Sequence, residues 1–234
     1  MKLSIVLPAY NEEENIENVV DSLLAIKREI GCDLVLFIVN DGSTDATPEI
    51  CKNLAQINPS IRCINHSRNI GYGGAIISGL RASEGDYVAI MDADGQFEAR
   101  DLVKLYRHRE SCDVVVGYRA LRADPLGRQI LGRMWTLIGR VLFKIPIRDL
   151  NCALKIFKRS LIETLDLRCS GPGINLEIMA QLVAAEIPIK EVHCSHYPRT
   201  KGNQSGGSLR VMLRALPELS YVFLEKFRVC RNPN

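Results

Sequence analysis

The first half of the chain alternates short apolar runs with longer amphipathic stretches. The apolar runs occupy residues 3–7, 34–39, 61–64, 87–91 and 114–116. Between them, apolar positions recur every three or four residues over 12–30, 45–57, 71–82 and 102–109. Near-continuous apolar strands that alternate with helices are typical of a parallel sheet covered on both faces, because each strand is then buried on both sides. This half is therefore predicted to be a doubly wound α/β unit.

The second half has a less regular pattern. A basic amphipathic stretch at 126–145 precedes a strand-like run at 153–157 and a helix at 174–185. A strand at 189–196 and a last helix at 209–229 follow. The sequence contains neither internal repeats nor a linker-like segment. We expect residues 1–234 to form one continuous domain, with a nucleotide-binding half at 1–117 and a smaller acceptor-binding half at 118–234.

Composition places the chain among ordinary globular proteins. Of its 234 residues, 47% are hydrophobic and 24% charged, which allows a packed core without disulfides. No run of 18 apolar residues occurs, so no membrane-spanning helix is predicted. The eight cysteines are scattered and follow no signal peptide, which favours reduced thiols in a cytoplasmic protein.

The net charge of +3 conceals two halves of opposite sign. Residues 1–117 carry 11 Lys and Arg against 18 Asp and Glu, a net charge of −7. Residues 118–234 carry 19 against 9, a net charge of +10. This asymmetry suggests two electrostatic roles, although chance segregation on solvated surfaces explains the charges equally well.

Four polar clusters follow the predicted strands of the first half. They comprise residues 8–12, 40–45, 68–75 and 92–96. In open α/β sheets, ligands bind outside the carboxyl ends of the strands, where such clusters converge. Turn formation accounts for each cluster taken alone, but less easily for four at one edge.

The cluster Asp92-Ala93-Asp94 suits a divalent cation. Two carboxylates separated by one residue, at the end of a buried strand, repel each other unless a counter-ion lies between them. Mg²⁺ and Mn²⁺ prefer such oxygen ligands, and a bound cation would stabilise a departing nucleoside diphosphate. Gln96 offers a further neutral oxygen. An ordinary turn is the alternative explanation, since Asp and Gly both favour turns.

The other clusters fit a nucleotide. Asp41 could accept hydrogen bonds from a base or ribose, and Tyr10 could stack on a base, although helix capping and loop packing remain alternatives. The glycine-rich stretch at 71–74 does not match a dinucleotide-binding fingerprint, because Ile76 stands at its third required position and the stretch follows the third strand.

The clusters, in this order, resemble the signatures of family 2 glycosyltransferases of GT-A fold. The stretches that carry the resemblance are Leu7-Pro8-Ala9-Tyr10-Asn11-Glu12, Asn40-Asp41-Gly42-Ser43-Thr44-Asp45, 69–75 and Met91-Asp92-Ala93-Asp94-Gly95-Gln96. Later stretches resemble the dolichyl-phosphate mannose synthase-like group, which includes bacterial polyprenyl-phosphate sugar transferases: Gly117-Tyr118-Arg119, residues 148–157, Glu177 and residues 198–205. The resemblance runs from about residue 3 to about residue 208.

The resemblance implies a Rossmann-like, mostly parallel sheet and an inverting sugar transfer. The residues implied to bind the nucleotide-sugar are Pro8, Ala9, Tyr10, Glu12, Asp41, Arg68, Gly71, Asp92 and Ala93. The metal, Mg²⁺ or Mn²⁺, is implied on Asp92, Asp94 and Gln96. The residues implied to bind the acceptor phosphate are Arg119, Arg133, Arg199 and Ser205. Ala153, Leu154 and Asn175 depart from the group's usual residues, so the shape of the acceptor pocket is expected to differ.

Asp94, Asp149 and Arg119 are the predicted catalytic residues. A phosphate monoester, with its second pKa near 6, is largely a dianion at neutral pH and needs cationic positioning more than a base. A sugar hydroxyl would need a base, for which Asp149 is the candidate. Transfer to a sugar hydroxyl in polysaccharide or lipopolysaccharide assembly is therefore an alternative, as is a non-catalytic nucleotide-binding module.

The basic second half also suggests contact with a membrane. On a helical wheel, Arg133, Arg140 and Lys144 flank an apolar arc in 126–145, as in an interfacial helix; burial of that arc in the core is an equal alternative. The expected partners are a nucleotide-sugar, a lipid phosphate, anionic lipid at the cytoplasmic membrane face and a separate membrane-anchor subunit, but not nucleic acid. His193 and His196 are expected to point to opposite faces of a strand rather than bind one metal.

Overall fold

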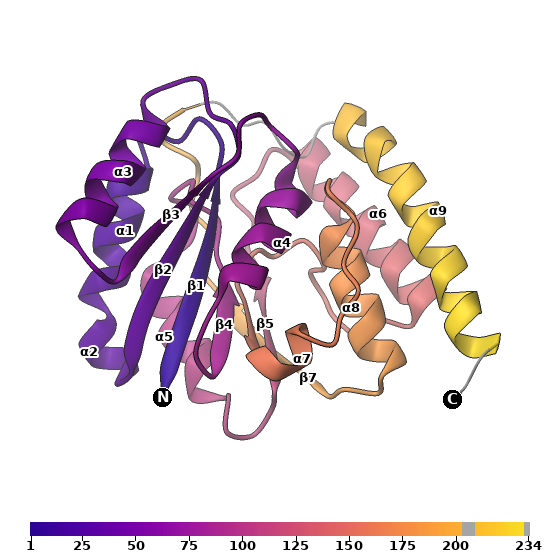
Figure 1. Ribbon diagram of the computed structural model, residues 1–234. Coiled ribbons are helices and arrows are strands. Elements are labelled where there is room, and N and C mark those ends of the chain that lie inside the picture. Colours follow the sequence, from indigo (N-terminus) through magenta and orange to yellow (C-terminus); the bar gives the residue numbers. More distant parts are fainter. Residues whose placement is uncertain (203–208, 232–234) are drawn as a thin grey trace.

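The fold is a seven-stranded mixed sheet with helices on both faces (Figure 1). The computed structural model describes residues 1–202 and 209–231, so Ser205 lies outside the described residues. The strands are β1 Lys2–Ala9, β2 Asp33–Asn40, β3 Ile61–Asn65, β4 Tyr87–Ile90, β5 Val114–Arg119, β6 Lys155–Lys158 and β7 Ile189–Cys194. Their order in the sheet is β3-β2-β1-β4-β6-β5-β7.

Most strand pairs are parallel. Strand β1 pairs in parallel with β2 and β4, β2 with β3, and β5 with β7. Only β6 among the described strands runs the other way, antiparallel to both β4 and β5. The prediction of a mostly parallel α/β sheet is confirmed, and strands from both halves of the chain join it.

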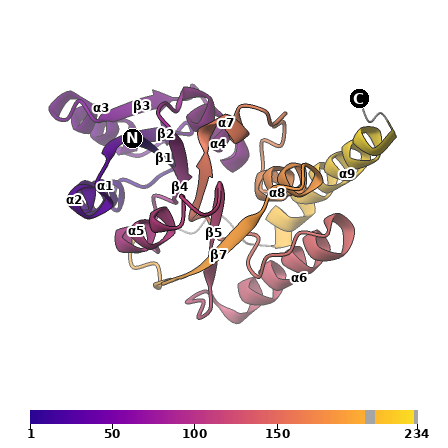
Figure 2. The ribbon, with the colours of Figure 1, turned by 90° about the horizontal axis from the view of Figure 1, so that it is seen from below.

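Two groups of helices cover the sheet. The helices are α1 Ile16–Ala25, α2 Lys27–Ile30, α3 Thr47–Ile57, α4 Tyr72–Ala82, α5 Ala99–Arg107, α6 Leu126–Phe143, α7 Arg159–Ile162, α8 Ile174–Ala184 and α9 Leu209–Arg231. Helices α1, α2, α3 and α5 pack in one buried hydrophobic cluster, whereas α4, α6, α7, α8 and α9 pack in the other. Seen from below, α6, α8 and α9 form a group beside the β5–β7 end of the sheet (Figure 2).

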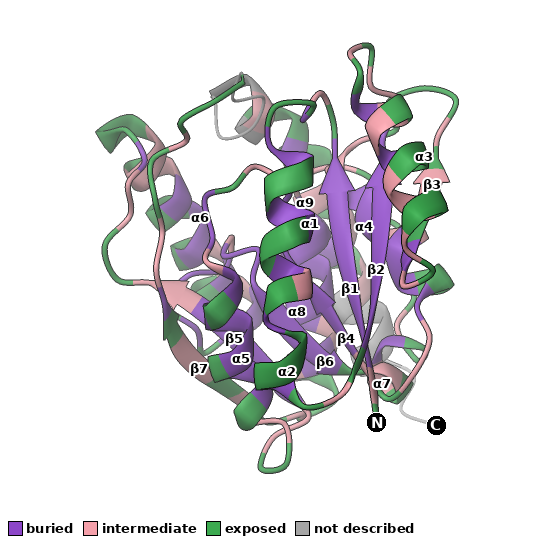
Figure 3. Cartoon of the chain, turned by 90° about the vertical axis from the view of Figure 1, so that its left-hand side faces the viewer, coloured by how far each residue is buried: buried purple, intermediate pink, exposed green. Residues whose placement is uncertain are grey.

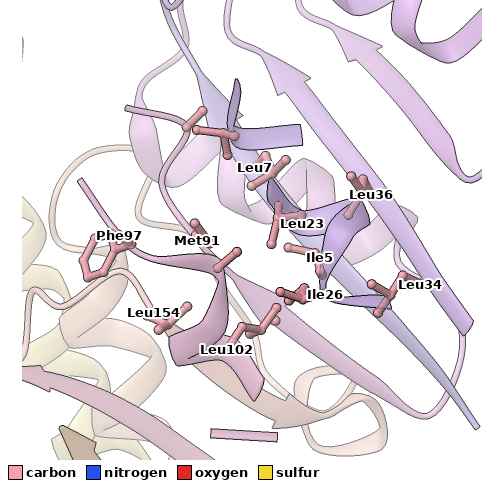
Figure 4. Packing of buried hydrophobic residues seen from close by; sticks show 14 of the residues in the cluster. Ile5, Leu7, Leu23, Ile26, Leu34, Leu36, Met91, Phe97, Leu102 and Leu154 are labelled. Carbon is pink, nitrogen blue, oxygen red and sulfur yellow. The ribbon is translucent and has the colours of Figure 1, made fainter. Parts of the chain in front are cut away.

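The apolar runs predicted as strands divide their side chains between these two clusters. In β1, Ile5 and Leu7 face the α1 side, where they pack with Leu23 and Leu36 (Figure 4), while Val6 faces the α4 side. Each fully buried Leu or Ile contributes about 1.5–3 kcal/mol. Figure 3 shows the same pattern, with β1 and β2 buried and the outer side of α1 exposed. Burial on both faces explains why the strands lack polar alternation.

The predicted elements differ from the structure mainly at their ends. The helix predicted at 12–30 begins at Ile16 and is split into α1 and α2, and Gly31, with a φ of 71°, caps the end of α2. The four-residue helix α7 was not predicted. Within 1–202 and 209–231, no helix combines the length and the apolar character needed to cross a bilayer.

Candidate active site

The four polar clusters converge at the carboxyl ends of the parallel strands. Register places Ala9 beside Asn40, and Asn40 beside Asn65, so β1, β2 and β3 end together. The Met91 N–H donates to the Val6 carbonyl at 3.1 Å, which continues the ladder to the end of β4. These ends lie at the upper edge of the sheet in Figure 1. The predicted convergence of the clusters on one edge is confirmed.

Asp92 and Asp94 form a pair of half-buried carboxylates just beyond β4. The Tyr72 hydroxyl donates to Asp92 Oδ1 at 2.9 Å, and the Gln96 backbone N–H donates to Asp94 Oδ1 at 3.0 Å. Burial, reinforced by the charge of Asp94, raises the pKa of Asp92 to about 7. Burial also raises the pKa of Asp94, although the Gln96 N–H opposes this.

This pair fits a divalent cation. Two neighbouring carboxylates whose pKa values are raised by burial are stabilised by a positive charge between them. Among the described residues there is no cluster of three or more Asp, Glu, His or Cys side chains that could hold a metal. Mg²⁺ often binds through one or two carboxylates and completes its shell with water and substrate phosphate. The Gln96 side-chain amide donates to the Tyr197 carbonyl at 3.0 Å.

Glu12 and Arg199, predicted to bind different ligands, pair with each other. The Arg199 guanidinium donates to both Glu12 carboxylate oxygens at 3.0 and 2.8 Å, and the Asn15 amide donates to one of them at 2.8 Å. Burial raises the pKa of Glu12 despite these partners. The pair joins the loop after β1 to the segment after β7, at the edge where Asp94 lies.

Asp41 organises the turn that leads into α4. Its buried carboxylate accepts the Ile70 and Gly71 N–H groups, each at 2.9 Å, and contacts the His66 ring nitrogen Nδ1 at 2.8 Å. These contacts use about three of the roughly four lone-pair positions of a carboxylate. Gly42 closes the same turn, because an added Cβ would lie 2.3 Å from the Arg68 carbonyl carbon. Binding of the nucleoside by Asp41 stays a prediction.

The remaining residues of the predicted donor site surround this edge. Pro8 and Ala9 are buried at the end of β1, while Tyr10 is 37% exposed and Arg68 is exposed. Tyr10 is thus partly exposed to solvent just beyond the end of β1. Ala93 is buried between the two carboxylates.

Arg119 and Asp149 form a buried ion pair. Arg119 ends β5 and donates to both Asp149 oxygens, from Nε at 2.6 Å and from a terminal nitrogen at 2.9 Å. Burial alone would raise the pKa of Asp149, but the hydrogen bonds and charge of Arg119 outweigh it and hold that pKa below its usual value. Asp149 is therefore a weak base in this arrangement. Arg133 lies on the exposed side of α6.

Several charged residues at this site were missed from the sequence. Asp124 is buried and accepts two hydrogen bonds from Arg122, at 3.0 and 2.8 Å, and one of its oxygens lies 3.5 Å from an Arg128 nitrogen. The charges of Arg119 and Arg128 both act to lower the pKa of Asp94, so the basic cluster lies within electrostatic reach of the paired carboxylates. The basic character of the second half was the only signal for Arg122 and Arg128, since no motif contains them.

Lys155 is a second missed residue. It is fully buried and donates to the Leu150 carbonyl at 3.3 Å, the Cys152 carbonyl and the Asn175 side chain at 2.9 Å. It thereby holds the turn that carries Asp149. Its position inside an apolar run gave no sign of this role.

The two histidines near the end of β7 have separate surroundings. His196 Nδ1 accepts the Ala123 N–H at 3.2 Å, and the ring packs edge-on against Phe97. Burial and the charge of Arg119 lower the pKa of His196 to about 4. His193 instead packs edge-on against Tyr118.

Comparison with known families agrees with this geometry. The family model described as glycosyl transferase family 2 matches residues 4–166, which is more than half of the chain. The chain belongs to glycosyltransferase family 2. The family predicted from the motifs is therefore confirmed.

This family 2 glycosyltransferase is similar to named bacterial proteins. It is 28% identical over 236 residues to the dodecaprenyl-phosphate galacturonate synthase of Rhizobium johnstonii, covering 97% of this chain and 68% of that protein. It is 29% identical over 213 residues to the undecaprenyl-phosphate 4-deoxy-4-formamido-L-arabinose transferase of Pectobacterium atrosepticum, covering 90% of this chain and 64% of that protein. The chain thus spans roughly two thirds of the length of these relatives.

Solved structures confirm the fold of this glycosyltransferase. Glucosyl-3-phosphoglycerate synthase from Mycobacterium tuberculosis, in complex with phosphoglyceric acid, superposes with a TM-score of 0.71 at 21% identity, covering 100% of this chain and 81% of that one. A structure of the same enzyme with Mn²⁺, uridine diphosphate and glucosyl-3-phosphoglycerate gives a TM-score of 0.70 at 20% identity. It covers 100% of this chain and 81% of that one. The predicted GT-A fold is confirmed.

Proposed function

We propose that this chain transfers a sugar, with inversion, from a nucleoside-diphosphate sugar to a polyprenyl phosphate at the cytoplasmic face of a membrane. The observation that carries the proposal is that two neighbouring carboxylates, Asp92 and Asp94, follow β4 at the carboxyl edge of the sheet, within electrostatic reach of the arginines around Asp124 and Asp149. The relatives named as polyprenyl-phosphate sugar synthases and transferases support the choice of acceptor.

In the donor half of the site, Asp92 and Asp94 would hold Mg²⁺ or Mn²⁺. The cation would neutralise charge on the departing diphosphate. Tyr72 fixes the orientation of Asp92 through its hydrogen bond, and Tyr10 is accessible for stacking on a base. The turn ordered by Asp41 brings the start of α4 to the same edge. Structures of the mycobacterial enzyme with Mn²⁺ support a divalent metal here.

In the acceptor half, the residues favour a nucleophile that is already ionised. The pKa of Asp149 is held below its usual value by Arg119, so Asp149 is poorly suited to take a proton from a sugar hydroxyl. A phosphate dianion needs no such base. Arg119, Arg122 and Arg128 supply the positive charge that would draw a phosphate toward the sugar.

The surface of α6 supports contact with lipid. One side of the helix is buried against the core through Trp135, Thr136 and Phe143. A second stripe stays exposed and consists of Leu126, Ile130, Met134, Leu137 and Val141. Arg133, Arg140 and Lys144 are exposed beside this stripe. The buried side agrees with packing of the helix in the core, and the exposed apolar stripe beside basic residues supports the proposal that α6 also contacts lipid. A separate membrane-anchor subunit remains part of the proposal.

The test is a transfer assay with the purified chain in lipid vesicles. Labelled UDP-, GDP- and dTDP-sugars are supplied with Mn²⁺ and either undecaprenyl phosphate or an oligosaccharide acceptor. We expect a labelled lipid with undecaprenyl phosphate only. Transfer to the oligosaccharide would instead support the hydroxyl alternative. Nucleotide binding by calorimetry, without turnover on either acceptor, would support a non-catalytic module.

A further inference from the structure

Residues 168–173, here called the strap, form the last part of the connection from α7 to α8 and are held by two carboxylates. The Arg168 and Cys169 N–H groups donate to Glu177 at 2.8–3.1 Å. The Gly171 and Gly173 N–H groups donate to Glu218 at 2.7 and 2.8 Å. Glu177 belongs to α8, which directly follows the strap, whereas Glu218 comes from α9, 45 residues further along than Gly173.

Glu218 fits closely between the strap glycines. A Cβ added to Gly171 would lie 3.0 Å from the Glu218 carboxylate oxygens, and one added to Gly173 would lie 2.8 Å from one of them. Hydrogen bonds from backbone N–H groups to a charged carboxylate are stronger than those between neutral groups. The contact therefore fixes the strap against α9.

The strap in turn packs on the first residues of α4. The Gly74 N–H donates to the Ser170 carbonyl at 2.9 Å. A Cβ added to Gly73 would lie 2.2 Å from the Cys169 carbonyl oxygen, and one added to Gly71 would lie 2.4 Å from that of Ser170. The contact is therefore made between backbones, without flexible side chains to absorb a shift of the strap.

The first residue of α4 reaches the paired carboxylates. Tyr72 donates its hydroxyl to Asp92 Oδ1 at 2.9 Å, and the ring packs against the hydrophobic cluster on this side of the sheet. A continuous series of hydrogen bonds and adjacent residues thus links Glu218 to the strap, the strap to the start of α4, and the start of α4 to Asp92. Helix α9 packs on α8, and α8 packs on α4, along the same route (Figure 1).

We propose that Glu218 is a positioning residue for the metal and donor site, acting through the strap and Tyr72 on the orientation of Asp92. The inference rests on the proposed function, because it assumes that Asp92 binds the cation of a metal–nucleotide complex. It assigns to α9 a role in catalysis in addition to its packing. Loss of the Glu218 carboxylate loosens the strap, and the hydrogen bond from Tyr72 to Asp92 then becomes less well directed.

The test compares nucleotide binding with and without metal in Glu218→Gln. Glutamine has nearly the same shape but can accept from only one of the two N–H groups through its oxygen. Calorimetry with UDP and with GDP, each with Mn²⁺ or with EDTA, separates the metal-dependent part of the affinity. Glu49→Gln, on the exposed side of α3, makes the same substitution away from the strap and is the matched control.

Removing a residue directly behind a metal ligand reduces metal affinity by about ten- to a hundredfold. Glu218 acts at one remove, through the strap and Tyr72, so we expect Glu218→Gln to weaken Mn²⁺-dependent binding by the smaller factor of about three- to tenfold. Binding in EDTA and the behaviour of Glu49→Gln should be unchanged. Tyr72→Phe should weaken Mn²⁺-dependent binding as well. Glu218→Gln should have little further effect in the Tyr72→Phe background, since both substitutions interrupt one route.

A loss of stability alone would weaken binding with Mn²⁺ and binding in EDTA alike. Thermal unfolding of each variant shows whether it is folded at the temperature of the binding measurement. If Glu218→Gln folds poorly, Glu218→Asp keeps the charge while shortening the reach, and the same metal-dependent loss is expected. Unchanged Mn²⁺-dependent affinity in the folded variant, or full additivity with Tyr72→Phe, would overturn the inference alone. Failure of the unmodified chain to bind any Mn²⁺–nucleotide would instead contradict the proposed function on which it rests.

Discussion

Replacement of Asp149 by Asn separates the structural role of this residue from a role as a base. The Asp149 and Arg119 side chains are 9% and 7% exposed and share two hydrogen bonds. Breaking a buried ion pair by removing one charge costs about 3–5 kcal/mol, because the other charge stays buried without its partner. Asn retains one acceptor oxygen, so we expect the lower end, about 3 kcal/mol. For a chain of this size, that corresponds to a fall of about 6–12 °C in Tm.

The loss should depend on pH in a defined direction. The pKa of Asp149 is lower in the folded state than its usual value, since Arg119 outweighs the effect of burial. Its contribution to stability is therefore present above the unfolded-state pKa of about 4 and is lost as the pH falls through the folded-state pKa. The difference in free energy of unfolding between the unmodified chain and Asp149→Asn should be constant from about pH 8 to pH 5 and should shrink below about pH 4.

Urea unfolding followed by circular dichroism across this pH range measures the difference. Asp21→Asn, on the exposed side of α1, is the control and should be nearly neutral. In the transfer assay, Asp149→Asn should retain turnover with undecaprenyl phosphate within about tenfold, because a phosphate dianion needs no base. A stability loss no larger than that of Asp21→Asn would refute the argument from the ion pair. A loss of turnover by about a thousandfold or more in the folded variant would show that Asp149 acts as a base.

Two further substitutions test other parts of the account. Leu137→Glu, in the exposed stripe of α6, should weaken binding to anionic vesicles by about tenfold or more in a flotation assay, since burying a leucine contributes about 1.5–3 kcal/mol. The Tm should be unchanged, because Leu137 is exposed in the folded chain. Unaltered flotation would contradict lipid contact by this stripe. Gly73→Ala should lower both Tm and nucleotide affinity, because its Cβ would lie 2.2 Å from the Cys169 carbonyl oxygen. Wild-type values in both assays would show that the strap is not packed on α4 as described.

The pattern of hydrophobic residues was sufficient to predict most of the fold. Short continuous apolar runs predicted the strands, and apolar residues that recur every three or four positions predicted the helices, so all seven strands and the long helices were located from the sequence. Ordered motifs at strand ends were sufficient to place Asp92, Asp94 and Asp41 at one edge, because parallel strands end together. The break between α1 and α2 and the short helix α7 were missed, since both depend on tertiary packing more than on local period.

The contacts among charged side chains could not be predicted. The motifs identified Glu12 and Arg199 separately, but their ion pair joins segments 187 positions apart in the chain. Asp124 forms ion pairs with Arg122 and Arg128, which no motif contains, and Lys155 is buried within an apolar run. The links from Glu218 to the strap likewise depend on how α9 docks, which a helical period does not reveal.

The most direct test of the central claim is a titration of turnover with Mn²⁺ in the unmodified chain and in Asp94→Asn. Substitution of one of two carboxylates that hold a cation should raise the Mn²⁺ concentration for half-maximal turnover by about tenfold or more and reduce maximal turnover by a similar or larger factor. Turnover that is unaffected by EDTA, or an Asp94→Asn variant with the same Mn²⁺ dependence as the unmodified chain, would contradict the claim that this pair holds the catalytic metal.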